Sequence, residues 1–168
     1  MIVSTHMRDA RQPMIRPVIR SATNADAPAV RELIFTILRE FDLPPDPDGV
    51  DADLDDLQAS YFERGGRFDV VLDACEQIIG CVGLYRTDER TIELRKMYVA
   101  AAGRGNGLGK RLLDHAVAEA RKLGCKRITL ETQSRLTTAI AMYKRYGFRP
   151  SCGEIHVHRC DQAYEMDL

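Results

Sequence analysis

The glycine-rich segment Arg104–Lys110 contains the residues whose types and spacing point most directly to chemistry. It follows the strand-like run Glu93–Val99 and precedes a long run with helical periodicity. Glycines leave backbone N–H groups accessible, and the start of a helix adds roughly half a positive charge. Because bare N–H donors at a helix start bind phosphate groups, the segment predicts a seat for a phosphorylated ligand.

Two common phosphate-binding loops do not fit this segment. The Walker loop needs a glycine where the chain has Arg104 and a hydroxyl residue where it has Arg111. The dinucleotide fingerprint, Gly-x-Gly-x-x-Gly, fails because its third glycine is missing from either starting position. The pattern that remains is Arg-x-x-Gly-x-Gly, formed by Arg104, Gly107 and Gly109.

This pattern resembles the acetyl-CoA loop of the GNAT-type N-acetyltransferase superfamily. The run Leu94–Val99 before it is similar to the family's fourth strand, and a long amphipathic helix follows it. Next come the strand-like run Arg127–Thr132 and the run Ala139–Phe148, which resembles the family's A-x-x-[LM]-Y-x-x-x-G-[FY] segment. Four elements in the family's order between residues 91 and 150 argue against a chance match. The likeness is weaker before residue 67 and after residue 150.

The resemblance implies an α+β fold with a GNAT-like, mixed and mostly antiparallel twisted sheet flanked by helices on both faces. It also implies an enzyme that transfers an acetyl group from the cosubstrate acetyl-CoA to a primary amine of a small molecule or peptide, without a metal. Homodimers are common in this family. The residues expected to bind the coenzyme on this basis are Met97, Tyr98, Val99, Arg104, Gly105, Asn106, Gly107, Leu108, Gly109 and Lys110.

The same resemblance implies a role for Tyr143. It matches the family tyrosine that donates a proton to the departing sulfur, and a phenol with a pKa of about 10 is close enough to a thiol with a pKa of about 8.5 for such a transfer. The chain departs from the pattern at Leu136, where many relatives carry an asparagine that contacts the coenzyme arm.

Two carboxylates are candidates for the base that takes the proton of the amine. Glu93 lies in the strand that leads to the thioester region, and Glu131 lies in the next strand, which splays from it in this family. Strict alternation would put Glu93, Arg95, Met97 and Val99 on one face of their strand. An ion pair between Glu93 and Arg95 is therefore the competing interpretation, and the sequence leaves it open. The resemblance implies an exception to strict alternation, because the family often has a bulge nearby that would break this register.

Hydrophobic periodicity and turn residues predict the elements that position these side chains. Helices are expected from Pro28 to Phe41, from Asp51 to Arg64, from Leu108 to Leu123 and from Thr138 to Tyr146. Strands are expected at Ile15–Arg20, Phe68–Leu72, Ile78–Tyr85, Thr91–Val99 and Lys126–Thr132, with one or two closing strands over Glu154–Met166. On a closing strand, alternating His156, His158 and Cys160 indicate a polar face rather than a metal site.

Composition narrows the class of protein. The 168 residues suit one domain, 15–168, after an extension or remnant, 1–14. A net charge of −1 argues against a dedicated nucleic-acid binder, and no apolar run is long enough to span a membrane. Five cysteines without a C-x-x-C pair fit reduced thiols in a cytoplasmic protein. Residues 104–168 carry a net charge of +5, which suits a polyanionic cofactor.

The acidic segment between Glu40 and Glu63 contains no Lys or Arg. It either attracts a cationic amine to the acceptor site or forms a solvated loop. Two other classes of protein stay open, a catalytically silent acyl-CoA-binding sensor and a nucleotide-phosphate-binding module. The aspartates of this segment are Asp42, Asp46, Asp48, Asp51, Asp53, Asp55 and Asp56.

Overall fold

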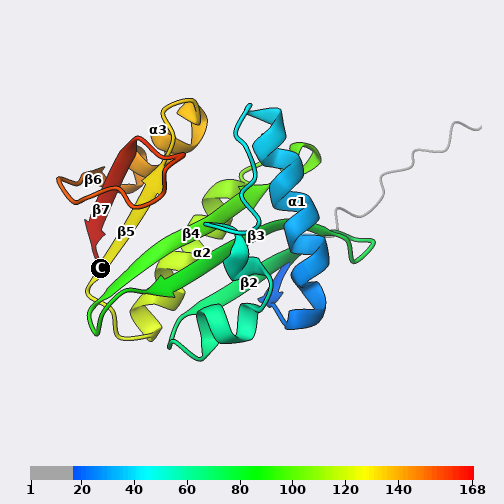
Figure 1. Cartoon of the computed structure of the whole chain (residues 1–168), viewed down its shortest axis with the longest axis horizontal. Helices are drawn as coiled ribbons and strands as arrows, with labels where there is room; N and C mark the ends of the chain where they lie inside the picture. The colour runs from blue at the N-terminus through cyan, green and yellow to red at the C-terminus, as the bar shows by residue number, and fades with distance from the viewer. Residues whose placement is uncertain (1–16) are drawn as a thin grey trace, which may run out of the picture.

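A seven-stranded mixed sheet forms the centre of the computed structural model, which describes residues 17–168 (Figure 1). The predicted extension 1–14 and the start of the predicted first strand lie outside the described residues. The strand order is β1-β2-β3-β4-β5-β7-β6, and every pair is antiparallel except β4 with β5. The strands are β1 (Val18–Ser21), β2 (Arg67–Leu72), β3 (Ile78–Arg86), β4 (Thr91–Val99), β5 (Arg127–Thr132), β6 (Arg149–Pro150) and β7 (Gln162–Asp167).

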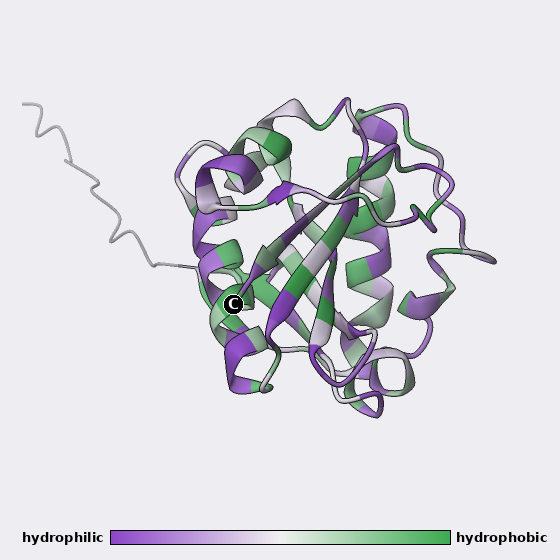
Figure 2. Cartoon of the chain, turned by 90° about the vertical axis from the view of Figure 1, so that its left-hand side faces the viewer, coloured by the Kyte–Doolittle hydropathy of each residue, from purple (hydrophilic) through white to green (hydrophobic). Residues whose placement is uncertain are grey.

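Helices cover both faces of this sheet, which confirms the expected α+β class. Helix α1 packs on one face, and α2 and α3 pack on the other (Figure 1). Apolar residues gather between the sheet and these helices (Figure 2). Among the described residues no helix is both long and apolar enough to cross a bilayer. The helices are α1 (Ala27–Glu40), α2 (Leu108–Lys122) and α3 (Thr137–Tyr146), with short 3₁₀ turns η1 (Asn24–Asp26), η2 (Ala52–Leu54) and η4 (Ala101–Gly103) and a π-helical turn η3 (Gln58–Phe62).

The prediction of one helix over Asp51–Arg64 is wrong. The chain forms only η2 and η3 there, because aspartate side chains of this segment make hydrogen bonds that compete with a continuous helix. The side chain of Asp51 is fully buried and turns into the protein. The side chain of Asp56 accepts the backbone N–H of Ala59 at 2.9 Å, which favours a new turn at this point.

The closing strand begins later than predicted. Residues 151–161 form a loop, and β7 starts at Gln162, so His156, His158 and Cys160 do not share a strand face. The backbone of this loop bonds to side chains: the carboxylate of Glu131 accepts the N–H groups of His156 and Val157 at 2.9 and 2.8 Å. Within residues 17–168 no three His, Cys, Asp or Glu side chains are grouped to hold a metal ion.

A β-bulge in β4 overturns the strict alternation expected from the sequence. Arg95 lies opposite Gly83, but Tyr98 lies opposite Cys81, so β4 has one extra residue in this interval. Lys96 takes a left-handed backbone conformation there, with φ of 51°. Past the bulge the faces exchange: the side chains of Glu93 and Arg95 are on the α1 side, whereas Met97 and Val99 pack with α2 and α3.

Candidate functional site

The site is built around a gap between β4 and β5. These parallel strands pair only where Thr91–Glu93 meet Arg127–Thr129, and beyond that point they separate. A cleft of about 920 Å³ opens there, lined by both strands, the glycine-rich loop, α3 and the loop 151–161. Among the described residues β4 has no partner on this side from Leu94 to Val99, so its edge can accept an extended ligand in the manner of an added strand.

The glycine-rich loop presents bare main-chain donors at one end of this cleft. None of the N–H groups of residues 105–110 donates a hydrogen bond of good geometry to an acceptor in residues 17–168. Gly105 and Gly107 both have φ of 82°, a conformation that favours glycine, and Gly107 directly precedes α2. No side chain caps α2, so its positive end is available to an anion.

The side chain of Arg104 braces this loop against α1. Its Nε donates to the carbonyl of Val99 at 2.9 Å, and its Nη2 lies 2.8 Å from a carboxylate oxygen of Glu40. The guanidinium also lies over the ring of Phe41, 5.5 Å from its centroid. Arg104 therefore fixes the loop beside the end of β4, a role that spacing alone does not reveal.

Most of the predicted site residues meet at this cleft. Asn106 does not line it, and Leu108, the first residue of α2, is buried in the hydrophobic core. For these two, only the main chain is placed to contribute to a binding loop. The predicted residues that line the cleft are Glu93, Met97, Tyr98, Val99, Arg104, Gly105, Gly107, Gly109, Lys110, Glu131 and Tyr143.

Tyr143 reaches the gap from α3. Its ring packs against Phe148 in the core, and its hydroxyl is 4.0 Å from the sulfur of Met97, its only hydrogen-bond partner within residues 17–168. Burial raises the pKa of Tyr143, so it remains a neutral phenol. The side chain is thus better suited to donate a hydrogen bond into the gap than to lose its proton completely.

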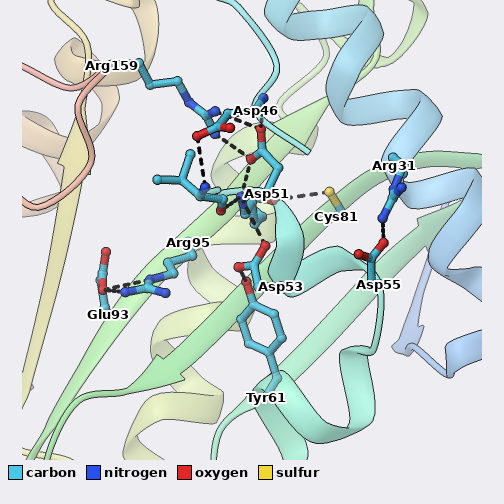
Figure 3. A network of polar contacts seen from close by, with 12 residues as sticks. Arg31, Asp46, Asp51, Asp53, Asp55, Tyr61, Cys81, Glu93, Arg95 and Arg159 are labelled. Carbon is cyan, nitrogen blue, oxygen red and sulfur yellow. Dashed lines mark hydrogen bonds and ion pairs between the residues drawn. The ribbon is translucent and has the colours of Figure 1, made fainter. Parts of the chain in front are cut away.

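Glu93 reaches the same gap from the α1 side of the sheet (Figure 3). Its carboxylate accepts hydrogen bonds from Nε and Nη2 of Arg95 at 2.7 and 2.6 Å, so the predicted ion pair is present. Burial alone would lower the pKa of Arg95, but these bonds raise it. The guanidinium also lies over the ring of Tyr85, 3.8 Å from its centroid. The pair fixes a carboxylate beside the cleft without removing it from the lining.

Glu131 lines the opposite side of the cleft but has other partners. Besides the two backbone N–H groups of the loop 151–161, it lies 3.1 Å from Nδ1 of His156. These contacts fix the loop over the gap.

A buried ion cluster that the sequence did not reveal closes the far end of the cleft (Figure 3). Asp51 accepts hydrogen bonds from both Nη atoms of Arg159 at 2.8 and 2.6 Å and from Nζ of Lys96. Nζ of Lys96 also donates to the carbonyl of Val50 at 2.8 Å. Burial would raise the pKa of Asp51, but these two cations hold it well below its usual range. The cluster joins the acidic segment, the β4 bulge and the loop 151–161.

Comparison with known proteins identifies the family. The family model described as "Acetyltransferase (GNAT) family" matches residues 31–148. The chain belongs to the GNAT acetyltransferase family. The chain is 37% identical over 137 residues to YjgM of Escherichia coli K12, which is named an N-acetyltransferase; the match covers 79% of this chain and 81% of YjgM. This GNAT protein is therefore an acetyltransferase enzyme.

Solved structures show the same fold. A GNAT acetyltransferase from Staphylococcus aureus superposes with a TM-score of 0.84 at 24% identity, covering 90% of this chain and 99% of the other. A spermidine N-acetyltransferase from Vibrio cholerae, in complex with CoA and spermine, superposes with a TM-score of 0.68 at 20% identity, covering 90% and 95%. The resemblance seen in the sequence is confirmed at the level of family and fold.

Proposed function

We propose that this GNAT enzyme transfers the acetyl group of acetyl-CoA to a primary amine by direct attack on the thioester. The observation that carries the proposal is the arrangement along one cleft. Bare N–H groups of residues 105–110 lie at the start of α2, the free edge of β4 follows, and Glu93 and Tyr143 stand at the gap. Such a row suits a diphosphate, an extended amide-containing arm and a reactive end, in that order.

On this proposal Glu93 is the base that takes a proton from the amine. An alkyl ammonium with a reference pKa of about 10.4 must lose a proton before its nitrogen can attack. Glu93 takes that proton, directly or through water, while Arg95 keeps the carboxylate in position. We prefer Glu93 to Glu131 because the contacts of Glu131 hold the loop 151–161.

On the same proposal Tyr143 stabilises the sulfur of the leaving group. As the amine nitrogen bonds to the carbonyl carbon, the carbon–sulfur bond breaks and negative charge develops on sulfur. Tyr143 lies on the α2 side of the sheet and Glu93 on the α1 side, so the two groups act from opposite faces of the gap. The neutral phenol stabilises the sulfur by a hydrogen bond, and solvent can supply the proton of the free thiol.

The test uses the purified full chain and two measurements. We expect acetyl-CoA to raise the melting temperature more than ATP or NAD does, and thiol to be released in the presence of an amine library with matching acetylated products in mass spectra. Binding without transfer would favour the acyl-CoA sensor. Stabilisation by ATP or NAD alone would contradict the proposal.

A further inference from the structure

A second hollow of about 480 Å³ adjoins the main cleft on the α1 side of the sheet. Val50 and Arg95 line both spaces, so the hollow continues from the point where Glu93 stands. Its other walls come from η2, η3 and Tyr85 of β3, which pack on the α1 side of the sheet. A substrate that reaches Glu93 from this face would occupy the hollow.

Two guanidinium groups and one tyrosine form the wall of this hollow. Arg95 stacks on the ring of Tyr85 at 3.8 Å, and Arg64 lies over the same ring at 5.1 Å. Nη1 of Arg64 also donates to the hydroxyl of Tyr85 at 2.6 Å. These contacts orient both planar groups before a ligand arrives, which favours binding because less side-chain freedom is lost.

Donors on both guanidinium groups remain available. Nε and Nη2 of Arg95 contact the carboxylate of Glu93, whereas its Nη1 has no acceptor within residues 17–168. No carboxylate of the described chain lies within ion-pair distance of Arg64, whose Nε and Nη2 also lack an acceptor there. A guanidinium edge matches the two oxygens of a carboxylate.

The two aspartates of the acidic segment nearest the hollow, Asp51 and Asp53, pair with groups other than Arg64 and Arg95. Asp53 is the carboxylate in its wall, but one oxygen accepts the hydroxyl of Tyr61 at 2.6 Å and the other lies 3.2 Å from Nζ of Lys96. Asp51 binds Lys96 and Arg159. Asp51 and Asp53 are therefore committed to partners inside the fold and do not present free negative charge to the hollow.

We infer that the acceptor is a small amine that also carries a carboxylate, bound by Arg64 and the free edge of Arg95 while its amine faces Glu93. This inference rests on the proposed function and specifies its substrate class. Because Glu93 and Arg95 are in direct contact, the amine and the carboxylate of the substrate must lie close together, as in a compact amino acid.

The experiment compares amines that differ only at the far end. The series is 4-aminobutanoate, 4-aminobutanamide and 1,4-diaminobutane, repeated at neighbouring chain lengths, with acetyl-CoA and thiol release as readout. We expect kcat/KM for the carboxylate to exceed that for the amide by about tenfold or more, which is the usual effect of a charge-assisted hydrogen bond. Equal values, or a preference for the diamine, overturn the inference and leave the acetyltransferase proposal intact.

Substitution of Arg64 tests whether this residue causes the preference for the carboxylate. Arg64→Gln should lower the ratio of the carboxylate to the amide by about tenfold, and Arg64→Lys should lower it less, because charge remains without the planar edge. Arg121→Gln removes another exposed guanidinium, on α2 and outside both spaces, and should keep the wild-type ratio. A ratio that Arg64→Gln does not change also overturns the inference. Failure of every amine, with acetyl-CoA neither bound nor cleaved, would instead defeat the proposed function.

Discussion

The two ends of the cleft are formed by different kinds of polar groups. At the α2 end, consecutive residues of one loop offer main-chain N–H groups that have no partner in the described chain. At the far end, side chains from distant segments meet, and Asp51, Lys96 and Arg159 satisfy one another in the interior. The α2 end, called the open end below, offers donors that have no partner in the described chain. The far end, called the closed end below, consists of charged groups that pair with one another and hold the walls of the cleft in place.

This difference suggests a division of labour. The α2 end would bind a constant cosubstrate, because backbone groups do not depend on side-chain identity beyond the glycines. The far end would hold the loop 151–161 and the acidic segment around a variable acceptor, because buried ion pairs fix geometry strongly once formed. Glu93 lies on β4 and lines the same cleft, and substitutions can test each part separately.

The largest effect is expected at Glu93, the proposed base. Glu93→Gln should lower kcat by roughly 10² to 10⁴, the usual contribution of a general base, and leave the Kd of acetyl-CoA nearly unchanged. Stopped-flow kinetics and calorimetry measure the two quantities. Full activity in this variant would move the base to Glu131, and Glu131→Gln would then be the variant to examine.

The closed end is tested through stability. Asp51→Asn should lower the free energy of unfolding by about 3 to 5 kcal/mol, because two buried cations lose their shared carboxylate. Asp48→Asn, at an exposed position of the same segment, is the control and should change it by less than about 0.5 kcal/mol. Urea unfolding measures both, and a small loss in Asp51→Asn would contradict the account of this end.

The wild-type protein and the Asp51→Asn variant should also differ in how their stability depends on pH. The folded-state pKa of Asp51 is depressed below the unfolded value of about 3.9, so its stabilisation is present above that value and is lost as the pH falls toward the folded pKa. The stability gap between wild type and Asp51→Asn should therefore be full at neutral pH and shrink below about pH 4. A gap that does not depend on pH would show that the charge of Asp51 is not the cause.

A smaller effect is expected for the leaving group. Tyr143→Phe should lower kcat by about tenfold to a hundredfold, since it removes one hydrogen bond to a developing charge. The melting temperature should change little, because within residues 17–168 the hydroxyl has one hydrogen-bond partner, the sulfur of Met97 at 4.0 Å. Tyr164→Phe, on β7 and outside the lining of the cleft, is the control. An unchanged rate in Tyr143→Phe would remove this residue from the mechanism.

The smallest effect separates ligand binding from backbone strain at the open end. Gly107→Ala should cost about 1 to 2 kcal/mol, because alanine resists φ of 82°, and should weaken acetyl-CoA binding up to about tenfold. Gly124→Ala is a matched control: its φ is 80°, and a Cβ would also meet no atom within 4 Å, but it follows the other end of α2. It should lose similar stability without weakening acetyl-CoA binding. Equal binding in both variants would contradict a role for the loop.

The open end could be predicted from the sequence because its signals are local. A glycine loop between a strand and an amphipathic helix lies within residues 91–123, and the strand-to-helix order fixes its geometry. The antiparallel run of β2, β3 and β4 also follows from local signals, because short polar turns separate its apolar strands. These features depend on neighbours in the chain.

The closed end could not be predicted because its parts are far apart in the chain. Asp51 and Arg159 are separated by more than a hundred residues, and nothing in either local sequence indicates the other. The position of the bulge at Lys96 is a second case, because the extra residue can be located only when β4 is paired with β3. That bulge moves Met97 to the face opposite Glu93, which alternation alone would not allow.

A crystal structure of the full chain with CoA tests the central claim most directly. The account predicts that the diphosphate lies within hydrogen-bond distance of the N–H groups of residues 105–110 and that the sulfur lies in the gap between β4 and β5, beside Tyr143 and Glu93. A diphosphate bound elsewhere, or a sulfur outside that gap, would contradict it.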